Sequence, residues 1–380
     1  MSANISYLNL LKLIGIAMLI VVASFIGRNR AQESQKQLIE KHFPDTLYHL
    51  KSINANKWIL HNKTTKKENF LYMGEGLGYN GKLYVLVQTD LDKLIDQVIP
   101  LAHHETPSFF KKLNKNHFYR QISGKEIKTF LENKPIDVIS GATISSKAVM
   151  QAIQNAYSKA EDISISQTNY PVFGFLEFFV LFLLIIGFLI VKIKNVKLKK
   201  NLLWISMLLS VIVLGFVYNQ HITLSRISAI LNGYFPSLSN ELYYYILLFG
   251  SILIILLTKK NTYCHSVCPF GVAQELLAKI GNAKPFRPKY YQQLKFMQGL
   301  ITLLALLVSL ALDNPTLAQY EVFGAFFQLT ANSIIFAVLF INIVLSLFVH
   351  KPWCNFMCPI DRFFAYIKLT RKSITDIWKS

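Results

Sequence analysis

The chain has 380 residues, of which 52% are hydrophobic and 16% charged, and its 40 Lys and Arg against 21 Asp and Glu give a formal charge of +19. An average soluble protein carries about 25% charged residues. This composition excludes a disordered chain, a disulfide-rich secreted module and an ordinary cytosolic enzyme. The long apolar runs also argue against a nucleic-acid partner. We therefore expect a membrane protein, with the lipid bilayer as its surroundings.

Six apolar segments approach the roughly 20 residues that a transmembrane helix needs. They cover residues 8–27, 172–191, 202–219, 242–258, 296–312 and 322–349. The first is predicted to be an uncleaved anchor. The alternative is a signal peptide, although Lys12 makes a thin basic region and Val22-Ala23-Ser24 a poor cleavage site. The predicted domains are an anchor at 1–27, a soluble domain at 28–171, a five-helix transmembrane bundle at 172–349 and a tail at 350–380.

The basic residues of the bundle gather on one side. Residues 192–200, 259–295 and 350–380 together hold 18 Lys and Arg against three acidic residues. The short loops on the opposite side contain one basic residue, Arg226. Because basic loops stay in the cytoplasm, this pattern predicts a multi-pass protein of the bacterial inner membrane with the soluble domain outside the cytoplasm.

The soluble domain is predicted to have a small α+β fold. An amphipathic helix is predicted at roughly 31–42, followed by β-like runs at 58–60, 70–73, 83–87 and 94–99. The glycine-rich segment 74–81 is predicted to form a turn. That turn alone leaves two readings open, a hairpin that needs positive φ angles and a loop that contacts a ligand.

A hydroxyl-rich segment at 137–146, Asp-Val-Ile-Ser-Gly-Ala-Thr-Ile-Ser-Ser, precedes a predicted helix from Lys147 to about Ala160. Free backbone N–H groups at a helix start, together with the helix dipole, favour phosphate binding. Simple capping of the helix by Ser or Thr is an equally good reading of the residues.

This segment resembles the flavinylation motif of FMN-binding domains in the G and C subunits of Rnf-type and Na⁺-pumping quinone reductases. It is also similar to the flavoprotein NosR and its dehalogenase-associated relatives. The resemblance implies that Thr143 carries FMN through a phosphoester bond made by an FMN transferase. It further implies a flavin site that includes Ser140, Gly141, Ala142, Ser145, Gly76, Gly78, Tyr79, Glu105 and Thr106. Lys82 and Asp92-Lys93 depart from the family pattern, near the expected isoalloxazine ring.

The four cysteines form two copies of one motif, aromatic-C-x3-C-P. Cys264 and Cys268 belong to the first copy at 263–269, and Cys354 and Cys358 to the second at 353–359. Each copy follows an apolar segment at its predicted cytoplasmic end, where a reducing environment argues against disulfides. Four thiolates brought together suit an iron–sulfur cluster or another metal, and a redox-active dithiol pair remains the alternative.

Paired C-x3-C-P motifs after membrane helices again resemble the NosR family, in its short form without a C-terminal ferredoxin domain. This implies electron transfer between quinol or a cytoplasmic donor such as ferredoxin and the extracytoplasmic FMN, in support of a respiratory reductase. The protein would then be a component of an oxidoreductase system, with no catalytic residue of its own predicted. A redox-sensing regulator and a maturation factor for a partner reductase are the alternatives. The apolar core is ~30 Å thick, too far for one electron transfer, so the flavin domain must dock closely on the bundle or a further carrier must lie inside it.

Overall fold

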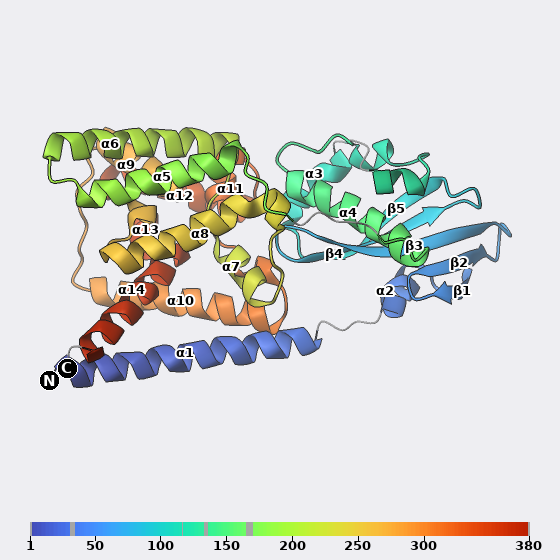
Figure 1. Cartoon of the computed structure of the whole chain (residues 1–380), viewed down its shortest axis with the longest axis horizontal. Helices are drawn as coiled ribbons and strands as arrows, with labels where there is room; N and C mark the ends of the chain where they lie inside the picture. Colours follow the sequence, from blue (N-terminus) through green and yellow to red (C-terminus); the bar gives the residue numbers. More distant parts are fainter. Residues whose placement is uncertain (1, 31–34, 116, 133–135, 165–169, 379–380) are drawn as a thin grey trace.

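The computed structural model describes residues 2–30, 35–115, 117–132, 136–164 and 170–378. A helical bundle and a sheet domain lie end to end along the long axis of the molecule (Figure 1). Both chain termini lie at the end of the bundle that points away from the sheet domain. The same end carries the basic loops after α5 (Phe175–Lys192) and α8 (Leu238–Thr258), so we call it the lysine-rich end and the opposite one the domain-facing end.

The sheet domain contains an antiparallel five-stranded sheet in the order β1-β2-β3-β4-β5. Its strands are β1 (Tyr48–Asn54), β2 (Lys57–Asn62), β3 (Glu68–Leu77), β4 (Lys82–Thr89) and β5 (Ile95–His103). Its helices are α2 (Gln35–His42), α3 (Pro107–Lys115), η1 (Phe118–Gln121), η2 (Ile127–Glu132) and α4 (Thr143–Ala160). The α+β prediction is confirmed. The predicted amphipathic helix is α2, which begins at Gln35, and residues 31–34 lie outside the described residues.

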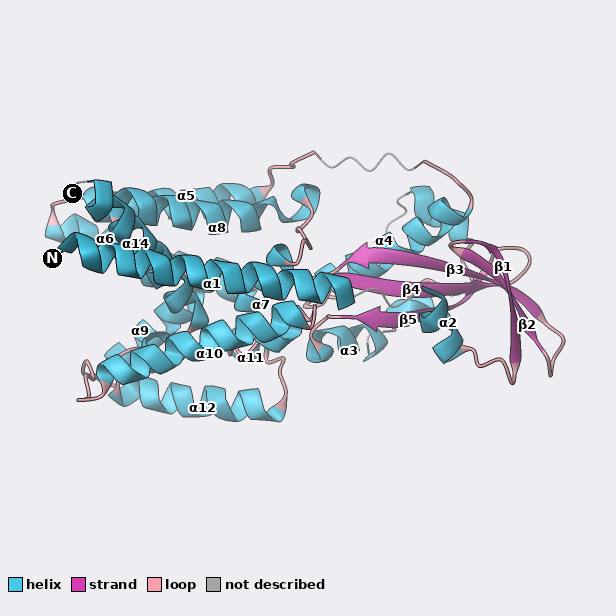
Figure 2. Ribbon diagram, turned by 90° about the horizontal axis from the view of Figure 1, so that it is seen from below, coloured by secondary structure: helices cyan, strands magenta, loops and turns pink. Residues whose placement is uncertain are grey.

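Successive side chains of a strand point to opposite faces of the sheet, and helices pack on both of these faces. Tyr72, Val85 and Val87 pack with α4 in one apolar cluster. Leu71 and Leu86 pack with α2 in another. The turn between β3 and β4 points toward the bundle (Figure 2). This arrangement brings one end of the sheet and the N-terminus of α4 against the domain-facing end.

The bundle and its flanking helices account for the rest of the described chain. They are α1 (Ser2–Arg30), α5 (Phe175–Lys192), α6 (Val196–Leu209), η3 (Ser210–Val217), α7 (Leu224–Leu231), α8 (Leu238–Thr258), η4 (Tyr263–Val267), α9 (Pro269–Ile280), α10 (Tyr291–Ala311), η5 (Pro315–Ala318), α11 (Phe323–Gln328), α12 (Ser333–Phe348), α13 (Pro352–Phe356) and α14 (Pro359–Trp378). Helix α1 runs beside α10 and α14 (Figure 1).

Within the described residues, five helices are long and apolar enough to cross a membrane, at Asn9–Asn29, Phe175–Lys192, Val196–Val217, Leu238–Thr258 and Tyr291–Ala311. The prediction of one continuous helix over 322–349 is wrong. That segment divides into α11 and the 16-residue α12, because Leu329 adopts a left-handed φ of 51° and the Asn332 side chain caps α12 by accepting a hydrogen bond from the Ile335 amide.

Candidate cofactor sites

A cavity of about 1610 Å³ lies where the sheet domain meets the bundle. Thr143, Ser140, Gly141, Ala142 and Ser145 line it together with Tyr79, Glu105 and Thr106, so eight of the ten residues predicted for the flavin site share one wall. The bundle contributes the other wall, which includes Glu177, His221, Thr223, Tyr243, Gln319 and Gln328. A single drug-sized ligand usually occupies a pocket of about 300–1000 Å³, so this cavity is large enough for a flavin nucleotide.

The N-terminus of α4 opens into this cavity. The helix begins at Thr143, earlier than the predicted Lys147, and its N-cap residue Ala142 has no side-chain capping hydrogen bond. The capping alternative is therefore not what the structure adopts. Gly141 has a φ of +73°, which favours glycine, and the Thr143 side chain is exposed. An uncapped helix start beside an exposed hydroxyl is well suited to a phosphate group.

A lysine that the motif did not indicate lies beside the same loop. A Cβ atom placed on Gly141 would lie 2.8 Å from the Lys112 Nζ atom and 3.3 Å from the Gln328 Oε1 atom. Burial lowers the pKa of Lys112, which stands on helix α3. Its ammonium group places positive charge next to the start of α4, where a phosphate would need it.

Glu105 connects the two predicted flavin motifs. Its carboxylate accepts hydrogen bonds from the Ser145 hydroxyl and, at 3.2 Å, from the Asn80 backbone amide. The side chain is buried, and this desolvation raises its pKa. Glu105 therefore holds the turn at 78–81 against the first turn of α4.

Tyr79 and Thr106 join the sheet domain to the bundle. The Tyr79 hydroxyl lies 3.2 Å from Thr223 Oγ1, and the Thr106 hydroxyl donates a hydrogen bond of 2.5 Å to Gln319. The guanidinium of Arg226 lies over the Tyr79 ring at 4.5 Å and is paired with Glu241. These partly buried contacts fix the docking of the predicted flavin domain on the bundle.

Two predicted flavin-site residues, Gly76 and Gly78, do not line the cavity. Gly76 belongs to β3, where an added Cβ atom would meet the Ala148 carbonyl of α4. At Gly78 an added Cβ atom would meet the Glu105 carboxylate. The described turn covers only 78–81, so the prediction of a turn over 74–81 is wrong: the first two glycines serve close packing of strand and helix.

The two cysteine motifs have the same backbone arrangement. The amide of Cys268 donates to the Tyr263 carbonyl at 2.7 Å, and the amide of Cys358 donates to the Trp353 carbonyl at 2.9 Å. In both copies the second cysteine directly precedes a proline that starts a helix, α9 or α14. The internal repeat seen in the sequence is therefore also a repeat of structure.

The first motif lies deep in the bundle. Ser206 donates a 3.0 Å hydrogen bond to the Ser266 carbonyl, and Ser210 donates to the Val267 carbonyl. Both serines belong to the span Val196–Val217. At 1.5 Å rise per residue, they lie about 10–16 Å from its domain-facing end. The peptide before Cys268 therefore re-enters the bundle instead of lying at its surface.

The surroundings of the thiols suit sulfur ligands of a cluster. The second cysteine of each motif directly precedes the first residue of a helix, α9 or α14, so the free backbone amides of that helix start lie next to it in the chain. The buried Trp353 Nε1–H has no hydrogen-bond partner within the described part of the chain. Such donors stabilise thiolates and inorganic sulfide.

The spacing of the thiols also bears on the type of metal site. The described residues contain no group of three or more His, Cys, Asp or Glu side chains close enough to bind one metal ion. A four-iron cluster needs less crowding, because each thiolate binds a different iron atom. A Cβ atom on Gly271 would lie 3.7 Å from both the Cys354 sulfur and the Cys268 Cβ atom, so the two motifs converge there.

Sequence reasoning missed Lys112, Arg226, Gln319 and the contacts of Tyr263. Lys112 is one of many lysines, and nothing local distinguishes it. Arg226 is distinctive in the sequence, because it is the one basic residue in the short loops opposite the basic side, but it was used only to predict the membrane topology. Tyr263 carried a signal as well, because an aromatic residue precedes the first cysteine in both motifs.

Comparisons with known proteins agree with both sites. Residues 78–158 match the FMN-binding domain. Residues 242–288 and 330–372 match the 4Fe-4S binding domain, with one cysteine pair in each segment. The G subunit of the proton-translocating ferredoxin:NAD(+) oxidoreductase complex of Clostridium ljungdahlii is 32% identical over 112 residues, which cover 27% of this chain and 60% of that relative. No solved structure matches the chain.

The chain is therefore an FMN-binding membrane flavoprotein that also holds an iron–sulfur cluster, and it has a role in electron transfer.

Proposed function

We propose that this protein conducts electrons through the bacterial inner membrane, between the four cysteines and an FMN bound to Thr143 outside the cytoplasm. The donor is quinol or a cytoplasmic ferredoxin, and the acceptor is an extracytoplasmic respiratory reductase. An FMN transferase forms the phosphoester on Thr143, as the resemblance to Rnf-type and NosR-type flavoproteins implies. The lysine-rich end faces the cytoplasm, in line with its excess of basic residues.

The observation that carries this proposal is the loop at 218–223, which reaches both sites. His221 and Thr223 of this loop line the cavity, and the Ile222 amide between them donates a 2.9 Å hydrogen bond to the Tyr263 hydroxyl. Tyr263 is the residue before Cys264. With the first motif about 10–16 Å from the domain-facing end, the gap between the sites is well below the full ~30 Å of apolar thickness.

Each cofactor supplies a chemistry that side chains lack. FMN converts between one-electron and two-electron transfer, and the cluster carries one electron at a time. The protein binds and positions them. Thr143 provides the tether, Lys112 and the start of α4 provide positive charge for the phosphate, and Glu105 holds the surrounding loops.

The test is flavin reduction in sealed membrane vesicles with the lysine-rich side outward. Chemically reduced ferredoxin is added outside, or a quinol is added to the lipid, and flavin absorbance is followed. The proposal predicts that wild-type flavin is reduced by one of these donors and that Cys354→Ser, which keeps its flavin, is reduced far more slowly.

Two variants separate the possible results. Thr143→Val, which lacks the tether, gives the baseline without bound flavin. A wild-type flavin that stays oxidised with both donors would contradict electron conduction and favour the sensor or maturation role. Reduction that is equally fast in Cys354→Ser would show that electrons bypass the cysteines.

A further inference from the structure

We propose that Lys295 raises the reduction potential of the four-cysteine site, because its ammonium group is turned into the bundle and is joined through Gln298 to the backbone of Cys358. The site is then easier to reduce than the cysteines alone would make it. The proposal concerns the cysteine site of the proposed function, but it rests only on the presence of a cluster there and does not require conduction to the flavin.

Lys295 is the one charged residue of the membrane span Tyr291–Ala311. A lysine near the end of a span usually extends its ammonium group to the membrane surface, where water solvates it. The loop residues Lys259, Lys260 and Lys284 of the lysine-rich end are exposed in this way. The side chain of Lys295 is only 16% exposed, so membrane topology alone does not explain its place.

Two hydrogen bonds hold the Lys295 ammonium group in this inward position. It donates to the Gln298 side-chain oxygen at 3.2 Å and to the Asp361 carboxylate at 3.1 Å. The Gln298 side-chain nitrogen in turn donates a 2.7 Å hydrogen bond to the Cys358 carbonyl. Gln298 and Cys358 are both buried, so this bonded route lies inside the protein. Because each hydrogen bond polarises the next, the positive charge acts on the peptide that carries the second cysteine of the motif.

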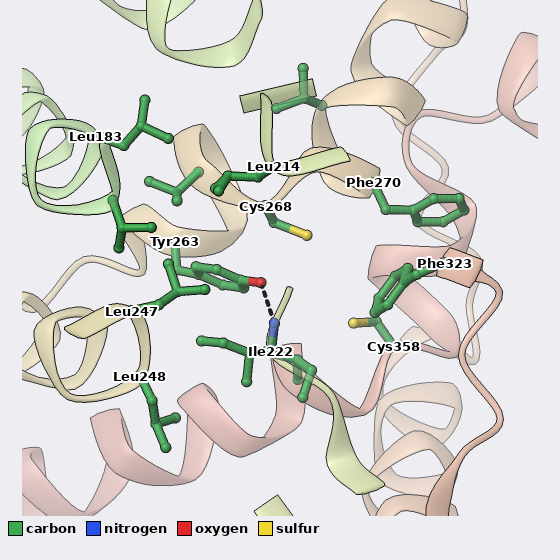
Figure 3. Close-up of a cluster of buried hydrophobic side chains, with 14 of the residues drawn as sticks. Leu183, Leu214, Ile222, Leu247, Leu248, Tyr263, Cys268, Phe270, Phe323 and Cys358 are labelled. Atoms are coloured by element: carbon green, nitrogen blue, oxygen red, sulfur yellow. Dashed lines mark hydrogen bonds between the residues drawn. The ribbon is translucent and has the colours of Figure 1, made fainter. Parts of the chain in front are cut away.

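The apolar packing around the cysteines keeps such a charge effective. Cys268 and Cys358 belong to one buried cluster, which Figure 3 shows together with Phe270 and Phe323. Charges are screened less in these surroundings than in water. One-electron reduction adds one negative charge at the cysteine site and breaks no bond of Lys295, which keeps its proton. A positive charge nearby stabilises the reduced form more than the oxidised form, and so it raises the reduction potential.

Asp361 gives the site a charge of the opposite sign. It pairs with Lys295 and lies three residues after Cys358 in the chain. Its side chain is 32% exposed against 16% for Lys295, so water screens the carboxylate more than the ammonium group. The two residues therefore have opposite expected effects on the potential, and the positive charge should dominate.

The first cysteine motif is held without a charge of this kind. The hydroxyls of Ser206 and Ser210 donate to the two carbonyls that precede Cys268. These neutral side chains reach the first motif from a membrane span, as Gln298 reaches the second. The two halves of the repeat therefore share a way of being held and differ in charge, which enters at the second half through Lys295.

The experiment measures the cluster potential in the purified full-length protein that carries FMN and iron. Iron, sulfide and flavin contents are determined first, and the protein is then titrated with dithionite and redox mediators while electron paramagnetic resonance follows the cluster signal. We expect Lys295→Met to keep its iron and to lower the equilibrium constant for reduction about tenfold, a shift of about 59 mV to more negative potential for one electron. Lys295→Arg keeps the charge and should stay near wild type. Lys289→Met is the matched control, since it removes the same charge from an exposed residue.

Asp361→Asn tests the opposite sign, and it carries the test alone if Lys295→Met loses its iron. Removal of this negative charge should shift the potential to more positive values, whereas a purely structural role of the ion pair would move both variants in the same direction. An unchanged potential in Lys295→Met, an equal shift in Lys289→Met, or an unshifted or more negative potential in Asp361→Asn would overturn the proposal. The titration involves no electron transfer from the cysteines to the flavin, so failure of the vesicle test would count against conduction and leave this result standing.

Discussion

Glu105 is the residue at which the predicted flavin motifs meet, and its burial makes the stability of the protein depend on pH. Because desolvation raises its pKa above 4.5, the folded state resists ionisation of this carboxyl more than the unfolded state does. The free energy of unfolding should therefore fall as the pH rises from 4.5 through the folded pKa. Glu105→Gln should remove this dependence, as followed by thermal unfolding of the whole protein in detergent at a series of pH values.

The comparison of wild type with Glu105→Gln also has an outcome that would contradict the prediction. If wild type and Glu105→Gln lose stability in parallel over that pH range, Glu105 is not the group responsible. The variant should keep about the low-pH stability of wild type, because an amide, like a protonated carboxyl, can accept from the Asn80 backbone amide and bond the Ser145 hydroxyl.

Thr143 is predicted to be the covalent anchor of FMN, and its exposed hydroxyl at the start of α4 leaves it accessible to a transferase. Thr143→Val keeps the shape of the side chain but removes the nucleophilic oxygen. We expect a fluorescent protein band on a denaturing gel under ultraviolet light for wild type and none for the variant. Thr129→Val, whose hydroxyl only bonds the Glu126 carbonyl, should keep the band. A fluorescent band in Thr143→Val would place the tether elsewhere.

At the residue scale, the sequence indicated the site through its motifs and missed what the fold added. Thr143, Glu105 and the cysteines stand in recognisable local patterns. Lys112 reaches Gly141, and Gln319 reaches Thr106, only through tertiary contacts between segments far apart in the chain. Local spacing carries no information about such pairs.

Among the elements, β3 and α4 show why glycine need not mean a turn. Gly74 and Gly76 lie in β3, and an added Cβ atom at either position would meet backbone atoms of α4. In the sequence these glycines are adjacent to the true turn at 78–81, so composition alone could not separate the two roles. Strand β1 was not predicted from the sequence, because its alternation of buried and exposed side chains is weak and most of its side chains are exposed.

Gly76→Ala should destabilise the sheet domain by about 1–3 kcal/mol, because the methyl group overlaps the Ala148 carbonyl and forces strand and helix apart. Gly15→Ala is the control, as nothing lies within 4 Å of its added Cβ atom. Chemical unfolding monitored by flavin fluorescence measures the difference. Equal stability of the two variants would show that β3 and α4 are not closely packed at this point.

At the scale of the whole molecule, the arrangement of the sheet domain and the bundle explains how electrons could cross the distance between the two predicted cofactor sites. Flavin and cysteines were predicted on opposite sides of an apolar layer of ~30 Å, with no carrier between them. Docking of the sheet domain through Tyr79 and Thr106, together with re-entry of the first cysteine motif, brings the two sites toward each other. Hydropathy located five spans and failed at 322–349. It could not reveal re-entrant peptides, because a short buried segment has the same sequence pattern as a loop.

Electron conduction between the two cofactors is tested most directly by single-turnover exchange in the purified protein. Electrons are delivered to the cluster by rapid mixing with reduced ferredoxin, and the iron–sulfur signal and the flavin absorbance are followed in time. We expect the flavin to become reduced as the cluster is re-oxidised, and Cys268→Ser to abolish this exchange. A flavin that stays oxidised beside an intact, reduced cluster would contradict conduction.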